Sequence, residues 1–101
     1  MINNRVELPK DKLVAFCKRW KISELGLFGS VLTESFRPDS DVDVLVTFAP
    51  DCRYSLFDLV LVQMDMEKLL GHKVDLIERK ALRNPFRKKA ILDSVETIYV
   101  A

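Results

Sequence analysis

Two aspartates at the head of a strongly hydrophobic segment constrain the fold of this chain more than any other feature. Asp41 and Asp43 stand at positions i and i+2, and the segment continues through Val44 to Phe48. Aspartate is a poor strand former, but the valine-rich run predicts a strand over 42–48. Because side chains at i and i+2 point to the same face of a strand, we expect both carboxylates together at one end of a sheet.

A glycine–serine pair lies upstream of these aspartates. Gly29-Ser30 comes eleven residues before Asp41 and directly after a hydrophobic segment that predicts a short strand over 25–28. Glycine has no Cβ, so a backbone turn at this point leaves room for a phosphate group. A short helix predicted over 30–35 would turn its first amides toward that phosphate. The turn and the two carboxylates together predict a site for a divalent metal ion and a phosphate-bearing ligand.

The rest of the chain alternates between helical and strand patterns. The predicted elements are helix 9–20, strand 25–28, short helix 30–35, strand 42–48, helix 56–70, strand 73–77, helix 85–94 and a final short strand 95–100. Ser55 with Asp58 forms the expected capping box of one helix, Asn84 caps another, and Asp75 lies within strand 73–77. This order predicts an α/β (α+β) fold, with a small mixed sheet covered by helices, in one domain over residues 1–101.

Composition limits the classes of function that remain. The chain has 101 residues, 49% of them apolar and 31% charged, which is typical of a folded globular domain. A net charge of +1 argues against a general polyanion-binding surface, so we expect no direct binding of nucleic acid. No segment approaches the length of a membrane span, so we expect no contact with a membrane. Cys17 and Cys52 lack metal-binding spacing, and reduced thiols in the cytoplasm are their expected state.

Three carboxylates on neighbouring strands suit metal-assisted phosphoryl or nucleotidyl transfer. Mg²⁺ prefers oxygen ligands and is usually held by a few carboxylates and the phosphates of the substrate. Asp41 and Asp43 would bridge two such ions, which lie roughly 3.5–4 Å apart in many enzymes of this kind, and Asp75 would orient the incoming hydroxyl. Taken singly, each motif has an ordinary structural explanation as a turn, a strand start or an exposed edge residue. Only the ordered combination of these motifs favours a catalytic site.

The same residues resemble a known family. The chain is similar to the minimal nucleotidyltransferases of the DNA polymerase β superfamily, in particular to the small antitoxins encoded beside HEPN toxins. The residues that carry the resemblance are Gly29, Ser30, Ser40, Asp41, Asp43, Asp75 and the closing stretch 84–99. The resemblance covers almost the whole chain and implies a DNA polymerase β-like nucleotidyltransferase fold.

An activity and a partner are also implied by this resemblance. The activity would be Mg²⁺-dependent transfer of AMP from ATP to a tyrosine of a HEPN ribonuclease toxin, which the modification silences. Asp41, Asp43 and Asp75 would be the catalytic and metal-binding residues, with two Mg²⁺ ions when nucleotide is bound. Gly29 and Ser30 would contact the triphosphate.

Two positions depart from the pattern of the family. Many relatives have a basic residue and then a small residue, usually glycine, at the places that Thr33 and Glu34 occupy here. A lost cation and an added carboxylate near the triphosphate would weaken the binding of ATP. All three aspartates are present, however, which argues against an inactive enzyme.

Two other functions stay open at this point. A non-catalytic antitoxin would neutralise its partner by binding alone, through the apolar part of the helix over 56–70. Nucleotidyl transfer to RNA or to a small molecule would use the same carboxylates. Enzymes of that last kind carry an additional substrate-binding domain, for which this chain offers no room, so a partner protein is the favoured acceptor.

Three further features each have a structural and a functional interpretation. The segment 56–64 is apolar on nearly every side, which favours deep packing, with a partner interface as the alternative. His72 is expected to be a surface residue and not a ligand. A basic stretch favours a solvated helix face over contacts with nucleotide phosphate, an acidic partner or RNA, and its members are Arg79, Lys80, Arg83, Arg87, Lys88 and Lys89.

Overall fold

The structure is a computed structural model that describes residues 9–101. Its elements are α1 (Lys10–Arg19), β1 (Ile22–Phe28), the 3-10 helix η1 (Gly29–Leu32), β2 (Val42–Phe48), α2 (Leu56–Leu70), β3 (Val74–Glu78), the 3-10 helix η2 (Arg79–Ala81), α3 (Pro85–Ser94) and β4 (Glu96–Val100). The predicted order of helices and strands is confirmed, including the final strand. The domain predicted over 1–101 begins with residues 1–8, which lie outside the described part of the chain.

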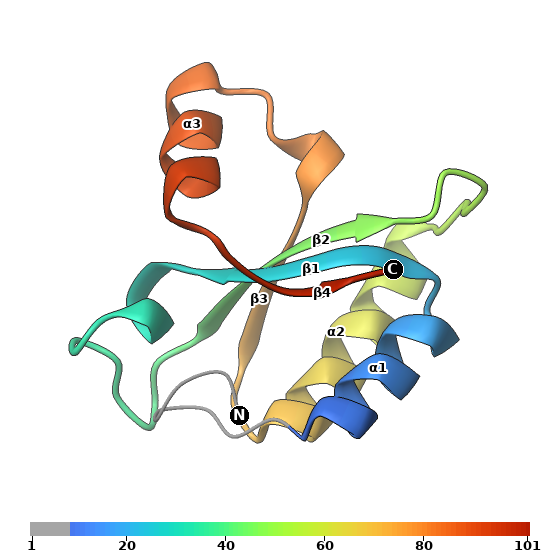
Figure 1. The fold of residues 1–101 in the computed structure, drawn as a ribbon, viewed down its shortest axis with the longest axis horizontal. Helices are drawn as coiled ribbons and strands as arrows, with labels where there is room; N and C mark the ends of the chain where they lie inside the picture. Colours follow the sequence, from blue (N-terminus) through green and yellow to red (C-terminus); the bar gives the residue numbers. More distant parts are fainter. Residues whose placement is uncertain (1–8) are drawn as a thin grey trace.

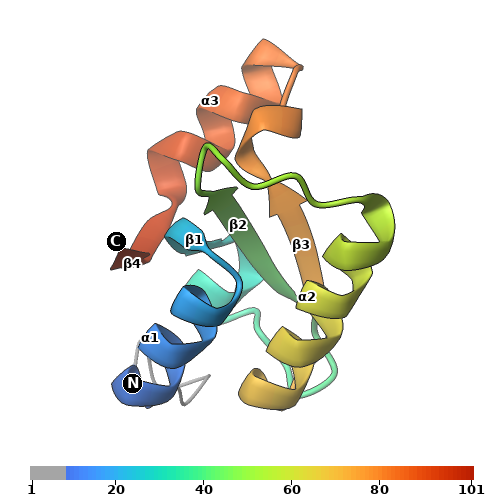
Figure 2. The same ribbon diagram turned by 90° about the vertical axis from the view of Figure 1, so that its right-hand side faces the viewer.

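The four strands found within residues 9–101 form one mixed sheet in the order β3-β2-β1-β4. β1 runs antiparallel to β2 and to β4, whereas β2 and β3 are parallel and are joined by the crossover helix α2. Figures 1 and 2 show α1 and α2 beside each other on one side of the sheet, and α3 on the other side. The predicted α/β (α+β) fold, a small mixed sheet covered by helices, is therefore confirmed.

β2 forms the centre of the core and has the bounds that its sequence predicts. Three of its side chains are fully buried on the face that α1 and α2 cover: Val42, Val44 and Val46. On the opposite face, Leu45 is buried against Phe28 beneath α3. Asp43 shares that second face but stays half-buried. The second face therefore combines a small apolar cluster with a partly open polar end.

Local sequence signals set the ends of the helices. The hydroxyl of Ser55 accepts a hydrogen bond from the Asp58 N–H at 3.2 Å, and the Asp58 carboxylate accepts one from the Ser55 N–H at 2.9 Å. This is the predicted capping box of α2, which ends at Gly71 in a left-handed conformation with φ 70°. Asn84 caps α3, as predicted, and Pro85 is its first residue.

Some element boundaries differ from the sequence predictions. β1 begins at Ile22, three residues earlier than predicted, because its first residues pair with the end of β2, where Ile22 lies opposite Phe48. The short helix expected over 30–35 is a single 3-10 turn, η1. Pro9 is the N-cap of α1, not its first helical residue. β3 runs from Val74 to Glu78, one residue later at each end than predicted.

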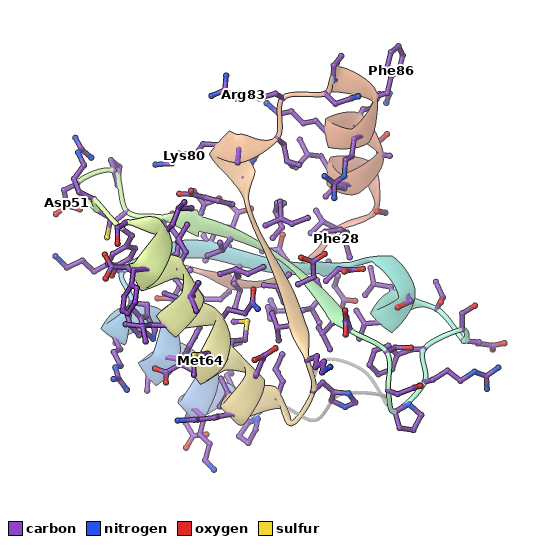
Figure 3. All side chains as sticks on the ribbon, turned by 180° about the vertical axis from the view of Figure 1, so that it is seen from behind. Phe28, Asp51, Met64, Lys80, Arg83 and Phe86 are labelled. Atoms are coloured by element: carbon purple, nitrogen blue, oxygen red, sulfur yellow. The ribbon has the colours of Figure 1, made fainter. Side chains whose placement is uncertain are left out.

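Deep packing was the favoured prediction for the apolar segment of α2, and it is wrong. The helix buries one stripe, Val62, Met66 and Leu70, whose spacing of four residues keeps them on one face. A second set of large apolar side chains is exposed, with exposed fractions from 41% to 82%: Leu56, Phe57, Val60, Leu61 and Met64. Figure 3 shows Met64 on the outer side of the helix, away from the sheet. A helix that lies on a sheet can bury only one of its faces against that sheet, so an all-round apolar pattern leaves the other face uncovered.

The two cysteines and the hydropathy of the helices can be compared with what the sequence predicts. Cys17 and Cys52 are free thiols, as predicted, and Cys17 is fully buried in the main core. Within residues 9–101, no helix combines the length and the hydropathy that crossing a membrane requires.

Candidate active site

Two of the predicted catalytic aspartates are register partners in the sheet. Asp43 on β2 lies directly opposite Asp75 on β3, so both side chains leave the same face of the sheet. Asp41 precedes β2 by one residue and is exposed, as is Asp75. Because β2 and β3 are parallel, the three aspartates gather where both strands begin. The structure thus brings all three to one end of the sheet.

Gly29 lies against the Asp43 carboxylate. Phe28 is the register partner of Asp43 on β1, so the chain turns into η1 immediately beside that side chain. Gly29 has φ 76°, a conformation that glycine adopts without strain, and a Cβ at this position would collide with Oδ2 of Asp43. From the sequence, the predicted role of Gly29 was to leave room for a phosphate. The structure gives it a second role that depends on the pairing of β1 with β2, which no local pattern reveals.

Ser30 follows Gly29 within η1 and is half-exposed. Its carbonyl oxygen accepts hydrogen bonds from the Thr33 N–H and from the Thr33 hydroxyl, both at 2.9 Å. Thr33 therefore closes the turn that carries Ser30. This contact gives the departure at position 33 a structural use, because its side chain fixes the turn after the glycine–serine pair.

The charges of Asp41 and Asp75 act on the carboxylate of Asp43. Partial burial raises the pKa of Asp43 above its ordinary value, and the negative charges of Asp75 and Asp41 raise that pKa further. The positive charge of Arg87, on α3, lowers the same pKa. Asp43 thus stands at the centre of a group of like charges with one opposing cation.

A hard divalent cation suits the donor atoms of this group. Carboxylate oxygens are the ligands that Mg²⁺ prefers, and a cation would relieve the repulsion that raises the pKa of Asp43. Among residues 9–101, however, no three His, Cys, Asp or Glu side chains are gathered closely enough to hold a metal ion as they stand. The backbone therefore places the three aspartates at one end of the sheet, but their side chains are not arranged around a common metal position.

His72 lies in the turn that leads into β3 and is more buried than predicted. Its ring is half-buried and stacks at a tilt against Phe36, with 5.2 Å between the ring centroids. Its Nδ1 atom is buried without a hydrogen-bond partner in the described part of the chain. The prediction of a plain surface residue is therefore wrong, and the His72–Phe36 contact instead joins the loop before Asp41 to the loop before Asp75.

Several members of the basic stretch form ion pairs with acidic side chains. Arg79 pairs with Glu24 at 3.8 Å, and Lys80 pairs with Glu78 at 3.4 Å. Lys89 pairs with Asp93 one turn later in α3, at 2.8 Å. These contacts fit the predicted solvated face. Arg87 departs from this pattern, because its charge acts on Asp43.

A cavity of about 190 Å³ lies at the other end of β2 and β3. It is lined by residues that include Phe48, Tyr54 and Glu78, and by none of the three aspartates. Tyr54 packs edge-on against Phe48, and its hydroxyl donates a hydrogen bond to the Trp20 carbonyl at 2.8 Å. This cavity is therefore separate from the three aspartates, and Glu78 is the one carboxylate among the described residues that line it.

The chain is similar to a known family and to known proteins. A family model described as a nucleotidyltransferase domain matches residues 10–98. The candidate protein adenylyltransferase MJ1379 of Methanocaldococcus jannaschii is 35% identical over 82 residues, which make up 81% of this chain and 80% of that protein. The protein adenylyltransferase MntA of Thermococcus cleftensis is 34% identical over 83 residues, 82% of this chain and 79% of that protein.

Solved structures share the fold. A candidate minimal nucleotidyltransferase superposes with a TM-score of 0.71 at 28% identity, covering 88% of both chains. A toxin–antitoxin complex with AMP-PNP gives 0.73 at 17% identity, covering 93% of this chain and 75% of that one. A complex of a tri-AMPylated Shewanella oneidensis HEPN toxin with its MNT antitoxin gives 0.65 at 16% identity, covering 91% and 70%. At their low identities, the two complexes are likenesses of fold alone.

The family match spans nearly all of the described residues, and it includes both strands that carry the aspartates and the turn at Gly29. The chain therefore belongs to the nucleotidyltransferase domain family and is a minimal nucleotidyltransferase, which confirms the resemblance inferred from its sequence.

Proposed function

We propose that this enzyme transfers AMP from ATP to a tyrosine of a HEPN-family toxin, with Mg²⁺ as cofactor, and thereby acts as the antitoxin of that protein. Its relative in Thermococcus cleftensis is named a protein adenylyltransferase. A structure of the same fold is an MNT antitoxin in complex with an AMPylated HEPN toxin. The proposal takes residues 1–101 as one minimal nucleotidyltransferase domain that works in the cytoplasm.

The observation that carries the proposal is the register of Asp43 with Asp75. This pairing sets two carboxylates on one face of the sheet, with Asp41 one residue before β2 and Gly29 against Asp43. If Asp43 were only a solvated residue at the start of a strand, it would not require Asp75, Asp41 or Gly29 beside it. A group of like charges at this place is costly without a cation, and it is the arrangement that metal-assisted nucleotidyl transfer requires.

Each residue has a role in the proposed reaction. Asp41 and Asp43 would hold Mg²⁺, which supplies positive charge to the phosphate oxygens when it is bound. Asp75 would orient the tyrosine hydroxyl and accept its proton as the phenolic oxygen bonds to the α-phosphorus. The bond from that phosphorus to the β-phosphate oxygen breaks, and pyrophosphate leaves. The turn at Gly29 and Ser30 would hold the β- and γ-phosphates, so the triphosphate stays in line with the incoming oxygen.

The ribonuclease activity of the toxin tests this proposal when the chain is supplied in substoichiometric amount. One molecule of an enzyme silences many toxin molecules, so a fiftyfold excess of toxin should lose its activity with time if ATP and Mg²⁺ are present. Asp43→Asn should abolish this effect. Asp51→Asn is the matched control, because it removes the same charge from an exposed loop at the far end of β2.

A binding-only antitoxin is the alternative, and the exposed apolar face of α2 is the observation that favours it. Such a protein would silence the toxin only at equal or greater amounts, with or without ATP. Asp43→Asn would then leave silencing intact, whereas Phe57→Ser with Val60→Ser would remove it. Substoichiometric silencing that depends on ATP excludes this alternative, and strictly stoichiometric silencing without ATP contradicts the enzymatic proposal.

A further inference from the structure

The loop that leads to Asp41 is an irregular segment, residues 33–41, between η1 and β2. Two hydrogen bonds close its last turn: the Ser40 N–H donates to the Arg37 carbonyl at 2.9 Å, and the Arg37 N–H donates to the Ser40 hydroxyl oxygen at 3.0 Å. These bonds fix the shape of the turn beside Asp41. Because they lie within the loop, the position of Asp41 in the protein depends on what anchors the loop from outside.

Phe36 anchors this loop. Its side chain is half-buried, whereas residues 33–35 and 37–39 are exposed. The Phe36 ring packs against the main core and contacts the ring of His72, with 5.2 Å between the ring centroids and an angle of 49° between the ring planes. Aromatic rings at this separation attract one another. The contact therefore holds the loop before Asp41 against the turn before β3.

His72 is itself held firmly, because it occupies the three-residue connection between α2 and β3. On one side of it, the Gly71 N–H donates to the Glu67 carbonyl at 2.9 Å. On the other side, the Val74 N–H donates to the Glu67 carboxylate at 3.0 Å. Asp75 follows directly after Val74. The backbone of His72 thus has a fixed position relative to the strand that carries Asp75.

A backbone hydrogen bond joins the same two segments a second time. The Val42 N–H, one residue after Asp41, donates at 2.8 Å to the carbonyl of Lys73, one residue after His72. Figure 1 shows the loop after η1 and the turn after α2 at the same end of the sheet. Like charges repel, so a loop without the ring contact would let Asp41 move away from the other two aspartates.

We propose that His72 is a positioning residue, whose ring holds Phe36 and thereby keeps Asp41 in place relative to Asp75. This inference rests on the proposed function, because it concerns the carboxylates of the same reaction. The ring acts by packing, since its Nδ1 atom is buried without a hydrogen-bond partner in the described part of the chain. In this role His72 touches neither substrate and takes no proton. It affects the rate through geometry, because a displacement of about 1 Å can slow a reaction roughly a hundredfold.

Four variants separate positioning from general support of the fold. His72→Ala and Phe36→Leu each remove the ring contact, and Phe36→Leu keeps an apolar side chain against the core. His72→Phe keeps the ring contact and removes the imidazole. Tyr54→Ala is the matched control, because Tyr54 packs against Phe48 at the far end of β2, with 4.9 Å between the ring centroids.

Amide hydrogen exchange tests the anchoring of the loop without relying on activity. His72→Ala and Phe36→Leu should each speed the exchange of the Val42 N–H roughly two- to tenfold, which corresponds to the loss of one aromatic contact. The kcat of AMP transfer should fall roughly tenfold in both variants, while the affinity for ATP stays within about twofold of the native value. His72→Phe should match the native chain in exchange and in kcat. Tyr54→Ala should lower the melting temperature at least as much as His72→Ala and keep native exchange and kcat.

Three results overturn the assignment. Native kcat and native Val42 exchange in His72→Ala and Phe36→Leu show that the ring contact positions nothing. A loss in His72→Phe equal to that in His72→Ala assigns the effect to the imidazole and not to the ring contact. An equal fall of kcat in Tyr54→Ala makes the effect a general one of stability. A native chain that transfers nothing to the toxin overturns the proposed function, whereas the exchange of the Val42 N–H still tests whether His72 anchors the loop.

Discussion

Asp43 and Asp75 are register partners on two parallel strands, so two carboxylates project side by side from one face of the sheet. Neighbouring like charges destabilise a folded protein unless a ligand offsets them. Asp43 lies at the margin of a packed cluster, where its partial burial adds to the cost. Sites that break a local rule in this way are where function is expected.

This relationship predicts that Asp43→Asn stabilises the metal-free protein while it removes activity. The neutral amide has nearly the same shape and eliminates the repulsion from Asp75 and Asp41. The folded-state pKa of Asp43 is raised above its unfolded value, so the folded chain binds the proton more tightly. The cost is therefore absent below the unfolded pKa, grows as pH rises toward the folded pKa, and is constant above it.

Thermal unfolding of both proteins in EDTA, across a pH series, checks this prediction. The melting temperature of Asp43→Asn should exceed that of the native chain at neutral pH, and the difference should shrink as pH falls through the carboxyl range. Added Mg²⁺ should stabilise the native chain more than the variant. A variant that is less stable at every pH would show that Asp43 supports the fold instead of straining it.

Two glycines with the same backbone conformation give a matched pair of variants. Gly29 has φ 76° and Gly71 has φ 70°, but a Cβ at Gly29 meets Oδ2 of Asp43 whereas one at Gly71 meets nothing within 4 Å. Gly71→Ala should lose roughly 1–2 kcal/mol of unfolding free energy from left-handed strain and keep full transferase activity. Gly29→Ala should lose at least as much stability and also lose activity, because the added methyl displaces Asp43. Denaturant unfolding and AMP transfer measure both effects, and equal activity of the two variants contradicts this account of Gly29.

Glu67 positions the strand that carries Asp75. Its Oε2 accepts a hydrogen bond from the Val74 N–H at 3.0 Å, at the first residue of β3. Glu67→Ala leaves that N–H without its partner and should cost about 1 kcal/mol of unfolding free energy, with a fall in kcat and an unchanged affinity for ATP. Glu67→Gln keeps an acceptor oxygen and should behave like the native chain. If Glu67→Gln loses as much unfolding free energy and kcat as Glu67→Ala, the effect comes from the charge of Glu67 and not from this hydrogen bond.

The two thiols should differ sharply in reactivity. Burial raises the pKa of Cys17 to about 12, and its side chain is fully buried in the main core. Cys52 is half-buried in the loop after β2. Because the thiolate is the reactive form, a disulfide reagent at pH 8 should modify Cys52 rapidly and Cys17 only after unfolding. Mass mapping of the modified peptides gives the result, and equal rates for the two thiols would place Cys17 outside the core.

The sequence predicted those features that depend on local patterns. The Ser55–Asp58 capping box, the Asn84 cap and the bounds of β2 all follow from residues near one another in the chain, and the structure confirms them. Features that depend on long-range pairing were less accessible. The early start of β1 at Ile22 follows from pairing with β2, and the contact of Gly29 with Asp43 follows from the same pairing.

The apolar side of α2 and the basic stretch were harder to interpret from the sequence, for related reasons. An apolar pattern on every side of a helix predicts burial only if something covers each side, and the side of α2 that carries Phe57 and Val60 has no cover in residues 9–101. Arg87 stands in a run of cations whose composition indicates a solvated face. The effect of its charge on Asp43 depends on the packing of α3 on the sheet through Ile91, and that packing joins segments far apart in the sequence.

The intact mass of a HEPN-family toxin, the proposed partner of this chain, tests the central claim most directly. The toxin is incubated with ATP, Mg²⁺ and either the native chain or Asp43→Asn, and fragmentation then locates any modified residue. We predict a gain of whole AMP units, on tyrosine, with the native chain only. An unchanged mass in the presence of a stable complex would contradict it, because the carboxylates would then serve no transfer to this partner.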